Sequence, residues 1–310
     1  MNSLAGKTVL LTGATGFIGS HLHRRLATLH PAKLVLVSRR AAHLSAPNEV
    51  TVTSGLDELS SATWDAAGVQ AFDLVLHLGA FTPKSASTAD DIEENFRANL
   101  LGTRALLDSL PKTPEKLVFS STLDVYRPPA VGEVLTEESP LAPASLYGAS
   151  KLFGEHLVAA YARRTGCATA VLRYGHIYGP GEDAYAKLIP NAIRALHRNE
   201  SPIVYGDGSV LRDFLYVDDA VEATLRAALS PVSSDPINIV SGSSRPVREI
   251  VEFLRSLRDG APAVTYHPEK PGGRSLQFSA GRMHRELGDW PLVPLETGLS
   301  REFASMGQRL

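Results

Sequence analysis

The 310-residue chain is poor in cysteine and contains no long apolar run. Its single cysteine, Cys167, excludes an internal disulfide and a thiolate metal site, and it favours a reducing compartment. No segment approaches the ~20 apolar residues that a membrane-spanning helix needs, and the N-terminal residues lack the apolar core of a signal peptide. We therefore expect a soluble, cytoplasmic protein without a membrane partner.

The chain also lacks an excess of charge of either sign. Its 31 Lys and Arg and its 33 Asp and Glu give a formal net charge of -2, and no dense basic cluster overrides this balance. This balance argues against nucleic acid as the main partner, because binding depends on clustered basic residues. The histidines, His21 and His23 among them, do not form a metal-ligand set, so we expect no metal site.

What the sequence has is a regular alternation of short apolar runs and helical patterns. The runs are apolar at consecutive positions, as expected for strands buried on both faces of a parallel sheet. They are residues 8–13, 33–38, 73–79, 116–121 and 168–174. Helical patterns begin at Ser20, Asp90 and Tyr147. This order predicts an α/β fold with a Rossmann-type, doubly wound parallel sheet.

The second half of the chain is less regular. Residues 190–200 and 217–229 have helical patterns, residues 236–240 form a short apolar run, and glycine and proline punctuate the C-terminal part. We expect residues 1–173 with 211–241 to form the Rossmann domain, and residues 174–210 with 242–310 to form a smaller C-terminal lobe. Clefts between lobes are preferred sites for small ligands.

The glycine-rich segment TGATGFIG follows the first predicted strand directly and opens a helix. Glycines spaced by three let the backbone approach a pyrophosphate, and the N-terminus of the helix supplies amides and positive charge. The spacing differs from the G-x-G-x-x-G of many Rossmann enzymes. We predict a dinucleotide-binding loop whose contact residues are Gly13, Thr15, Gly16, Phe17, Ile18 and Gly19.

The end of the second predicted strand carries Ser38, Arg39 and Arg40. An acidic residue about 20 positions beyond the glycines would bond the adenosine ribose and favour NAD, but this segment has none. Arginine suits a 2′-phosphate because its paired N–H donors match the phosphate oxygens. We therefore predict that these three residues contact NADP(H), with NAD(H) as the alternative.

Two further segments carry groups suited to proton transfer. YGASK places Tyr147 and Lys151 four residues apart, hence on one face of the predicted helix. A free tyrosine has a pKa of ~10, and a neighbouring ammonium together with a positive nicotinamide ring would lower it. SSTLDVY, residues 120–126, ends the fourth predicted strand with hydroxyls and a carboxylate. That segment is either a strand-end cap or half of a catalytic centre.

Seven motifs, in one order along nearly the whole chain, carry a resemblance to a known family. They are TGATGFIGSHL, HLGA, NLLGT, SSTLDVY, YGASK, RYGHIYGPG and RDFLYVDDA. The sequence resembles the extended short-chain dehydrogenase/reductase family, in its branch of nucleotide-sugar epimerases, dehydratases and reductases. This resemblance implies an enzyme with an NAD(P)-binding Rossmann domain, a C-terminal lobe that holds a nucleoside-diphosphate sugar, and commonly a homodimer.

The resemblance also implies roles for individual residues. Tyr147 would be the catalytic acid/base with Lys151 as its partner, and Thr122 would bond the sugar oxygen at the carbon that exchanges hydride. Further cofactor contacts would come from Leu78, Gly79, Ala80, Asn99, Ser120, Tyr174 and His176. The substrate would meet Thr122, Phe81, His176 and Arg212. His176 stands where family members often have asparagine, so it would contact the diphosphate, act at the sugar, or simply pack.

Leu123 and Asp124 indicate which reaction the family fold would perform. Family members that eliminate water across C5 and C6 follow the hydroxyl residue with Asp-Glu or Ser-Glu. Leu123 cannot donate a proton, which disfavours a complete 4,6-dehydratase, whereas Asp124 retains a carboxylate in the candidate catalytic set. We predict hydride transfer at C4 by a 4-ketoreductase that uses NADPH. A 4-epimerase with tightly bound NAD, a non-catalytic NADP-binding module, and an enzyme of this family for another substrate class are alternatives.

Overall fold

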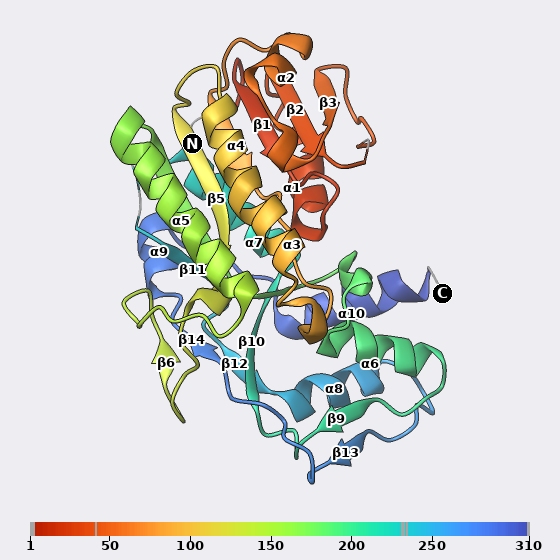
Figure 1. Ribbon diagram of the computed structural model, residues 1–310. Coiled ribbons are helices and arrows are strands. Elements are labelled where there is room, and N and C mark those ends of the chain that lie inside the picture. The colour runs from red at the N-terminus through yellow and green to blue at the C-terminus, as the bar shows by residue number, and fades with distance from the viewer. Residues whose placement is uncertain (1–3, 41, 231–232, 234, 309–310) are drawn as a thin grey trace.

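The computed structural model describes residues 4–40, 42–230, 233 and 235–308. Its centre is a seven-stranded parallel sheet in the order β11-β7-β5-β4-β1-β2-β3 (Figure 1). These strands are β1 (Thr8–Thr12), β2 (Lys33–Ser38), β3 (Glu49–Thr53), β4 (Leu74–His77), β5 (Lys116–Thr122), β7 (Ala168–Tyr174) and β11 (Ile237–Ile239). The predicted Rossmann-type α/β fold is thereby confirmed.

Helices cover both faces of this sheet, as the consecutive apolar positions predicted. Alternate side chains point to opposite faces of a strand, so Val9 and Leu11 enter one apolar cluster and Leu10 enters the other. Helices α1 (Phe17–Ala27) and α7 (Val217–Leu229) pack in the first cluster. Helices α2 (Ser61–Ala66), α4 (Gly102–Ser109) and α5 (Leu146–Thr165) pack in the second, on the face nearer the viewer in Figure 1.

The sequence did not reveal two features of the larger domain. Strand β3 lies at the edge of the sheet, and its sequence, EVTVT, alternates polar and apolar residues instead of running apolar. The long helical segment predicted from Asp90 is helical, but α3 (Ile92–Glu94) and α4 are joined by a π-helical stretch, Asn95–Leu101. Such wide turns occur frequently at functional sites.

The smaller lobe is built around short strands and three helices, at the bottom of Figure 1. Strands β8 (His176–Tyr178), β10 (Leu211–Tyr216) and β12 (Ser244–Pro246) form one sheet, and β9 (Ile203–Tyr205) pairs with β13 (Thr265–His267). The helices are α6 (Leu188–His197), α8 (Val247–Ser256) and α10 (Leu295–Gly307). Within the described ranges, no helix is long and apolar enough to cross a membrane.

The remaining elements connect the two lobes. Strand β6 (Val134–Leu135) pairs with β14 (Gln277–Phe278), and helix α9 (Gly281–Leu287) contacts β11 and α7 of the larger domain. Short 3₁₀ turns are Leu56–Glu58, Ala86–Thr88, Leu123–Val125 and Glu182–Ala184. The division into domains stays a prediction. Strand β10 pairs with β8 and β12 of the smaller lobe, although the sequence placed it in the Rossmann domain, and α9 contacts β11 and α7, although the sequence placed it in the smaller lobe.

Two glycines let helix α5 lie unusually close to β5 and to the turn that follows it. A Cβ atom at Gly154 would stand 2.5 Å from Cζ of Phe119, and one at Gly148 would meet the backbone carbonyl of Asp124. Phe119 is fully buried, so its ring has little room to move. Glycine at these two positions therefore sets the distance between the helix and the strand.

We expect Gly154→Ala to destabilise the protein by about 1–3 kcal/mol, although alanine normally favours a helix, because the added methyl overpacks the core. Urea denaturation of the wild type and the variant measures this loss. Phe119→Leu would make room for the methyl, so the double variant should be more stable than the sum of the two single effects predicts. Strict additivity, or a more stable Gly154→Ala, would contradict the packing argument.

Candidate active site

A cleft of about 1160 Å³ runs along the carboxyl ends of the central strands, against the segment that leads into the smaller lobe. In parallel sheets, this edge is where ligands bind. Most of the residues predicted from the sequence line the cleft together. They are Gly13, Thr15, Gly16, Phe17, Ile18, Gly19, Ser38, Arg39, Arg40, Leu78, Gly79, Ala80, Phe81, Ser120, Thr122, Asp124, Tyr147, Lys151, Tyr174 and His176.

The glycine loop has the shape that a dinucleotide requires. Gly13 has φ +75°, and a Cβ atom there would lie 2.7 Å from the backbone nitrogen of Gly79. A Cβ at Gly19 would collide with the carbonyl of Gly13, whose oxygen accepts a hydrogen bond from the Gly16 amide. Helix α1 begins at Phe17, so its first amides face this cradle. The cradle therefore fits the pyrophosphate of NAD(P).

The end of the cleft nearest β2 is lined by charged residues. The side chain of Arg39 is 67% exposed, and one guanidinium nitrogen lies 3.6 Å from Glu94. Arg97 lies 3.2 Å from Glu94 and 3.7 Å from Asp57. Three guanidinium groups, with Arg40, thus share this end with two carboxylates.

The opposite end of the cleft brings together the candidate catalytic residues. Thr122 ends β5, and its hydroxyl accepts a hydrogen bond of 3.2 Å from the amide of Asp124. The hydroxyl of Tyr147 interacts with those of Thr122 and Thr82. Lys151 follows one turn later on α5 and places its ammonium 4.4 Å from the centre of the Phe119 ring. SSTLDVY and YGASK therefore form one site.

Burial shifts the ionisation of these groups in opposite directions. It lowers the pKa of Lys151 to about 7, against the opposing effect of the Glu155 carboxylate. It raises the pKa of Tyr147, and the nearby Asp124 adds to this rise. The sequence led us to expect a lowered pKa for Tyr147. Burial and Asp124 outweigh the hydroxyls of Thr82 and Thr122, so Tyr147 is a neutral phenol, the form that donates a proton.

Asp124 faces the same end of the cleft, and crowding by protein atoms raises the pKa of its carboxyl group. The ammonium of Lys187 and the hydroxyl of Thr122 oppose this rise. Lys187 is itself paired with the buried Glu182 at 2.8 Å and lies over the ring of Tyr185. These three residues belong to the segment between β8 and α6, and no motif in the sequence pointed to them.

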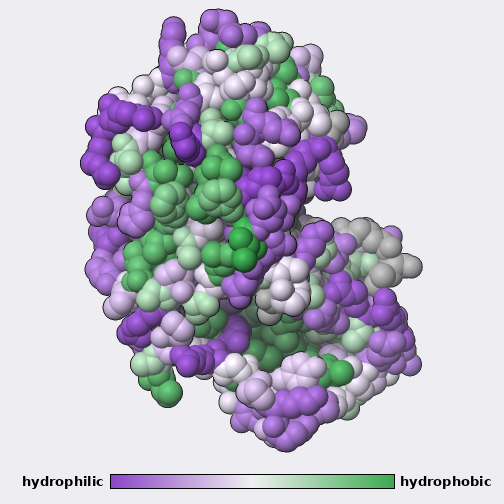
Figure 2. Space-filling model, viewed as in Figure 1, coloured by the Kyte–Doolittle hydropathy of each residue, from purple (hydrophilic) through white to green (hydrophobic). Residues whose placement is uncertain are grey.

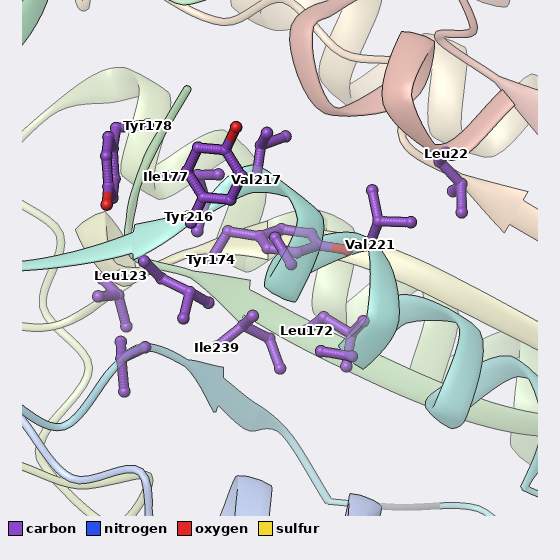
Figure 3. Packing of buried hydrophobic residues seen from close by; sticks show 14 of the residues in the cluster. Leu22, Leu123, Leu172, Tyr174, Ile177, Tyr178, Tyr216, Val217, Val221 and Ile239 are labelled. Atoms are coloured by element: carbon purple, nitrogen blue, oxygen red, sulfur yellow. The ribbon is translucent and has the colours of Figure 1, made fainter. Parts of the chain in front are cut away.

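Leu123 lines the cleft between Thr122 and Asp124 but offers no polar atom there. Its side chain is buried in the apolar cluster that also holds Ile177, Tyr178 and Ile239 (Figure 3). The 3₁₀ turn Leu123–Val125 fixes this orientation, because Thr122 caps the turn. Residue 123 therefore contributes to core packing and supplies no proton donor at this position.

Two predicted ligand contacts do not line the cleft. Asn99 is buried behind it and accepts a 2.7 Å hydrogen bond from the amide of Phe81 while donating 2.9 Å to the hydroxyl of Ser150. Arg212 donates to the carbonyls of Leu211 and Arg274 at 2.9 and 2.6 Å. Asn99 thus supports the residue next to Lys151, and Arg212 stands beside the cleft.

His176 does line the cleft, next to Arg212 and Lys187. Burial and these two cations lower its pKa to about 4, so the imidazole is neutral at physiological pH. Its Nδ1 atom is buried and has no hydrogen-bond partner in the described part of the chain. Across the described ranges, no group of three or more His, Cys, Asp and Glu side chains could hold a metal ion.

The sequence missed the cleft wall that follows β3. Residues Ser54, Gly55, Leu56 and Asp57 line the cleft next to Arg39. The signal that could have located them is the position of polar residues directly after a strand of a parallel sheet, but the strand itself had not been predicted. Residues 82–85, before the 3₁₀ turn Ala86–Thr88, also line the cleft.

The motifs and this geometry agree with a family of known proteins. The family model described as "NAD dependent epimerase/dehydratase family" matches residues 9–240. The chain belongs to this family. Membership confirms the resemblance to the nucleotide-sugar branch of the extended short-chain dehydrogenases/reductases, and it confirms an enzyme.

Relatives in this family catalyse different reactions. A UDP-N-acetyl-alpha-D-glucosaminuronate decarboxylase of Bacillus cytotoxicus is 32% identical over 84% of both chains. The structure of MoeE5 in complex with UDP-glucuronic acid and NAD is 30% identical, covers 98% of this chain and 100% of its own, and has a TM-score of 0.85. The UDP-glucose 4-epimerase of Thermotoga maritima, with UDP-glucose, is 25% identical over 97% and 99%, with a TM-score of 0.85.

Proposed function

We propose that the protein transfers hydride at C4 of a nucleoside-diphosphate sugar, and that it acts as a 4-ketoreductase with NADPH. The observation that carries this proposal is the meeting of Thr122, Tyr147 and Lys151 in the cleft that also contains the glycine cradle. Relatives at 30–32% identity that bind or act on UDP-sugars support the substrate class.

The residues of the chain account for the proton that accompanies the hydride. NADPH, held by the glycine cradle, would supply the hydride to C4. The hydroxyls of Thr122 and Tyr147, which interact with each other, would hold the oxygen of the C4 ketone between them. Tyr147, as a neutral phenol, donates its proton to that oxygen, which leaves a hydroxyl on the sugar. The Lys151 ammonium stabilises the phenolate that remains on Tyr147.

Dehydration is disfavoured by the environment of residue 123. Elimination of water needs an acid for the leaving hydroxyl and a base for the C5 proton. Asp124 could serve as one of them, but Leu123 is packed in the apolar core and offers no second group. The side chains of the cleft thus suit the transfer of one hydride to a single carbon and of one proton to the oxygen that it carries.

The choice of cofactor and direction rests on two observations. Arg39 and Arg40 line the end of the cleft nearest β2, where the adenosine would lie, and β2 ends without a carboxylate, which favours a 2′-phosphate. The neutral phenol of Tyr147 favours reduction of a ketone. A 4-epimerase with bound NAD is the second candidate, and the NAD complex of MoeE5 and the Thermotoga maritima 4-epimerase support it.

We expect Tyr147→Phe to lower kcat about 10²–10⁴-fold, because general-acid catalysis is lost, while the Kd of NADPH stays the same. The assay follows nicotinamide absorbance with nucleoside-diphosphate-4-keto sugars of several bases. Tyr205→Phe removes an exposed hydroxyl from β9 and should keep full activity. Full activity of Tyr147→Phe would contradict the mechanism. Interconversion of two sugars without net NADPH oxidation would favour the epimerase.

We expect the wild type to prefer NADPH over NADH, and Arg39→Ala to lower kcat/KM for NADPH about 10–100-fold with little effect on NADH. The reason is the loss of a charged hydrogen bond to the 2′-phosphate. Arg104→Ala is the control, because Arg104 pairs with Asp108 on the surface of α4. A wild-type preference for NADH would overturn the NADPH assignment and favour the epimerase.

A homodimer is also part of the proposal. Large apolar side chains are exposed on the segment from α3 to the π-helical stretch and on α5, where Figure 2 shows an apolar area. They are Ile92, Phe96, Leu101, Leu146 and Phe153. Contiguous apolar surface of this kind marks protein interfaces. The cytoplasmic location predicted from the composition stays a prediction.

We expect the wild type to have twice the chain mass of 33.2 kDa, and Phe153→Glu to shift it toward the monomer, because a charge would be buried at the interface. Light scattering coupled to size-exclusion chromatography measures both masses. Ile203→Glu changes an equally exposed residue on β9 of the smaller lobe and should leave the dimer intact. A monomeric wild type would refute the homodimer.

A further inference from the structure

Behind the catalytic end of the cleft lies a buried ion pair between Glu155 of α5 and Arg173 of β7. Nε and one terminal nitrogen of the guanidinium donate to the two carboxylate oxygens at 3.0 and 2.7 Å. The hydroxyl of Ser121 donates to the same carboxylate. The other guanidinium nitrogen donates 2.8 Å to the hydroxyl of Tyr126, which donates 2.7 Å to the side chain of Asn238.

Three members of this network, Ser121, Tyr126 and Glu155, are adjacent to parts of the candidate catalytic site. Ser121 immediately precedes Thr122 on β5, and Tyr126 follows the turn that contains Asp124. Glu155 lies one helical turn after Lys151. The network therefore joins the strand, the turn and the helix that supply the reacting groups.

The surroundings of Lys151 explain why a carboxylate is needed here. Lys151 is 3% exposed, and burial favours loss of its proton. From β5 it meets the Phe119 ring, and from β4 the neutral His77, which is held between the hydroxyls of Thr12 and Thr103. Burial and Lys151 lower the pKa of His77 to about 3, so His77 contributes no charge.

Other charged or titratable groups near Lys151 lie on its own helix and on β7. Tyr147 is a neutral phenol, and Arg173 is fully engaged with Glu155 and Tyr126. Across the described ranges, Glu155 is the carboxylate whose charge favours the Lys151 ammonium. Its bonds to Arg173 and Ser121 leave its position little freedom.

We propose that Glu155, anchored by Arg173 and Ser121, is a positioning residue that keeps Lys151 charged and holds α5 against β5 where Tyr147 meets Thr122. Its effect on rate rests on the proposed function. Its effect on Lys151 does not, since that is a property of the folded chain alone.

The direct test is competitive labelling of Lys151 with acetic anhydride over a series of pH values, read by mass spectrometry of the peptide. Only the unprotonated amine reacts. In Glu155→Gln, the pKa of Lys151 should fall, so labelling at about pH 5 should rise about tenfold over the wild type. Asp219→Asn is the control. Asp219 is a buried carboxylate bonded to Trp290 and Val293, so its loss should destabilise the protein without changing this labelling.

Glu155→Gln leaves Arg173 buried without its partner and could therefore fail to fold. A second variant is needed for that case. Glu155→Gln with Arg173→Met removes both charges, which proteins tolerate better than the loss of one. It should show the same increase in labelling. Wild-type labelling in either folded variant would overturn the proposal.

A second test measures kcat of the wild type and of Glu155→Gln over a series of pH values. Because the ammonium is the required form, rate is lost as pH rises through the pKa of Lys151, and a lower pKa moves this loss to lower pH. We expect kcat of Glu155→Gln to fall about fivefold near pH 7, because a one-unit fall in the pKa lowers the ammonium fraction from about one half to about one tenth, with KM for the nucleotide sugar changed less than about twofold. An unshifted pH profile would overturn the proposal. Absence of turnover in the wild type would instead count against the proposed function, and labelling would still decide the role of Glu155.

Discussion

The close approach of helix α5 to strand β5 is the constraint on which the rest of the site depends. Thr122 and Tyr147 come from separate elements, and their hydroxyls can hold one oxygen only if the helix lies within side-chain reach of the strand. Gly148 and Gly154 permit that approach, since a Cβ at either would collide with the turn or with Phe119. On the other side of the helix, the π-helical stretch presents Asn99 to Ser150.

This approach has an electrostatic cost that the chain offsets locally. The same packing that aligns Thr122 and Tyr147 also buries Lys151, which favours the neutral amine just where an ammonium is useful. A carboxylate in contact with solvent would be too weakly coupled to oppose that effect appreciably. A buried carboxylate can, but it needs its own partner, and Arg173 provides one with matched geometry. The close packing of α5 on β5 thus accounts both for the contact between Thr122 and Tyr147 and for the need for the buried Glu155–Arg173 pair.

Features that depend on the local sequence pattern, such as the interior strands, could be predicted from the sequence. Features that depend on how deeply a residue is buried in the folded protein could not. Consecutive apolar residues located the interior strands, whereas the edge strand β3 alternates, and its polar neighbours such as Asp57 were missed with it. The spacing of Tyr147 and Lys151 predicted a shared face. It could not give the direction of the Tyr147 pKa, because burial is a property of the assembled lobes. Lys187 reaches the cleft from the other lobe and carried no motif.

Residue 123 shows how the smaller lobe takes part in deciding the reaction. Its side chain lies at the wall of the cleft and packs in one apolar cluster with Ile177 of β8 and Ile239 of β11. A carboxylate placed there would lose its hydration against apolar side chains, which is costly without a partner. The proposed function therefore rests on core packing around residue 123, which disfavours the second acid of a dehydratase, as well as on the absence of a charged residue. The reaction proposed for this cleft accordingly takes place at the one carbon that Thr122 and Tyr147 would address.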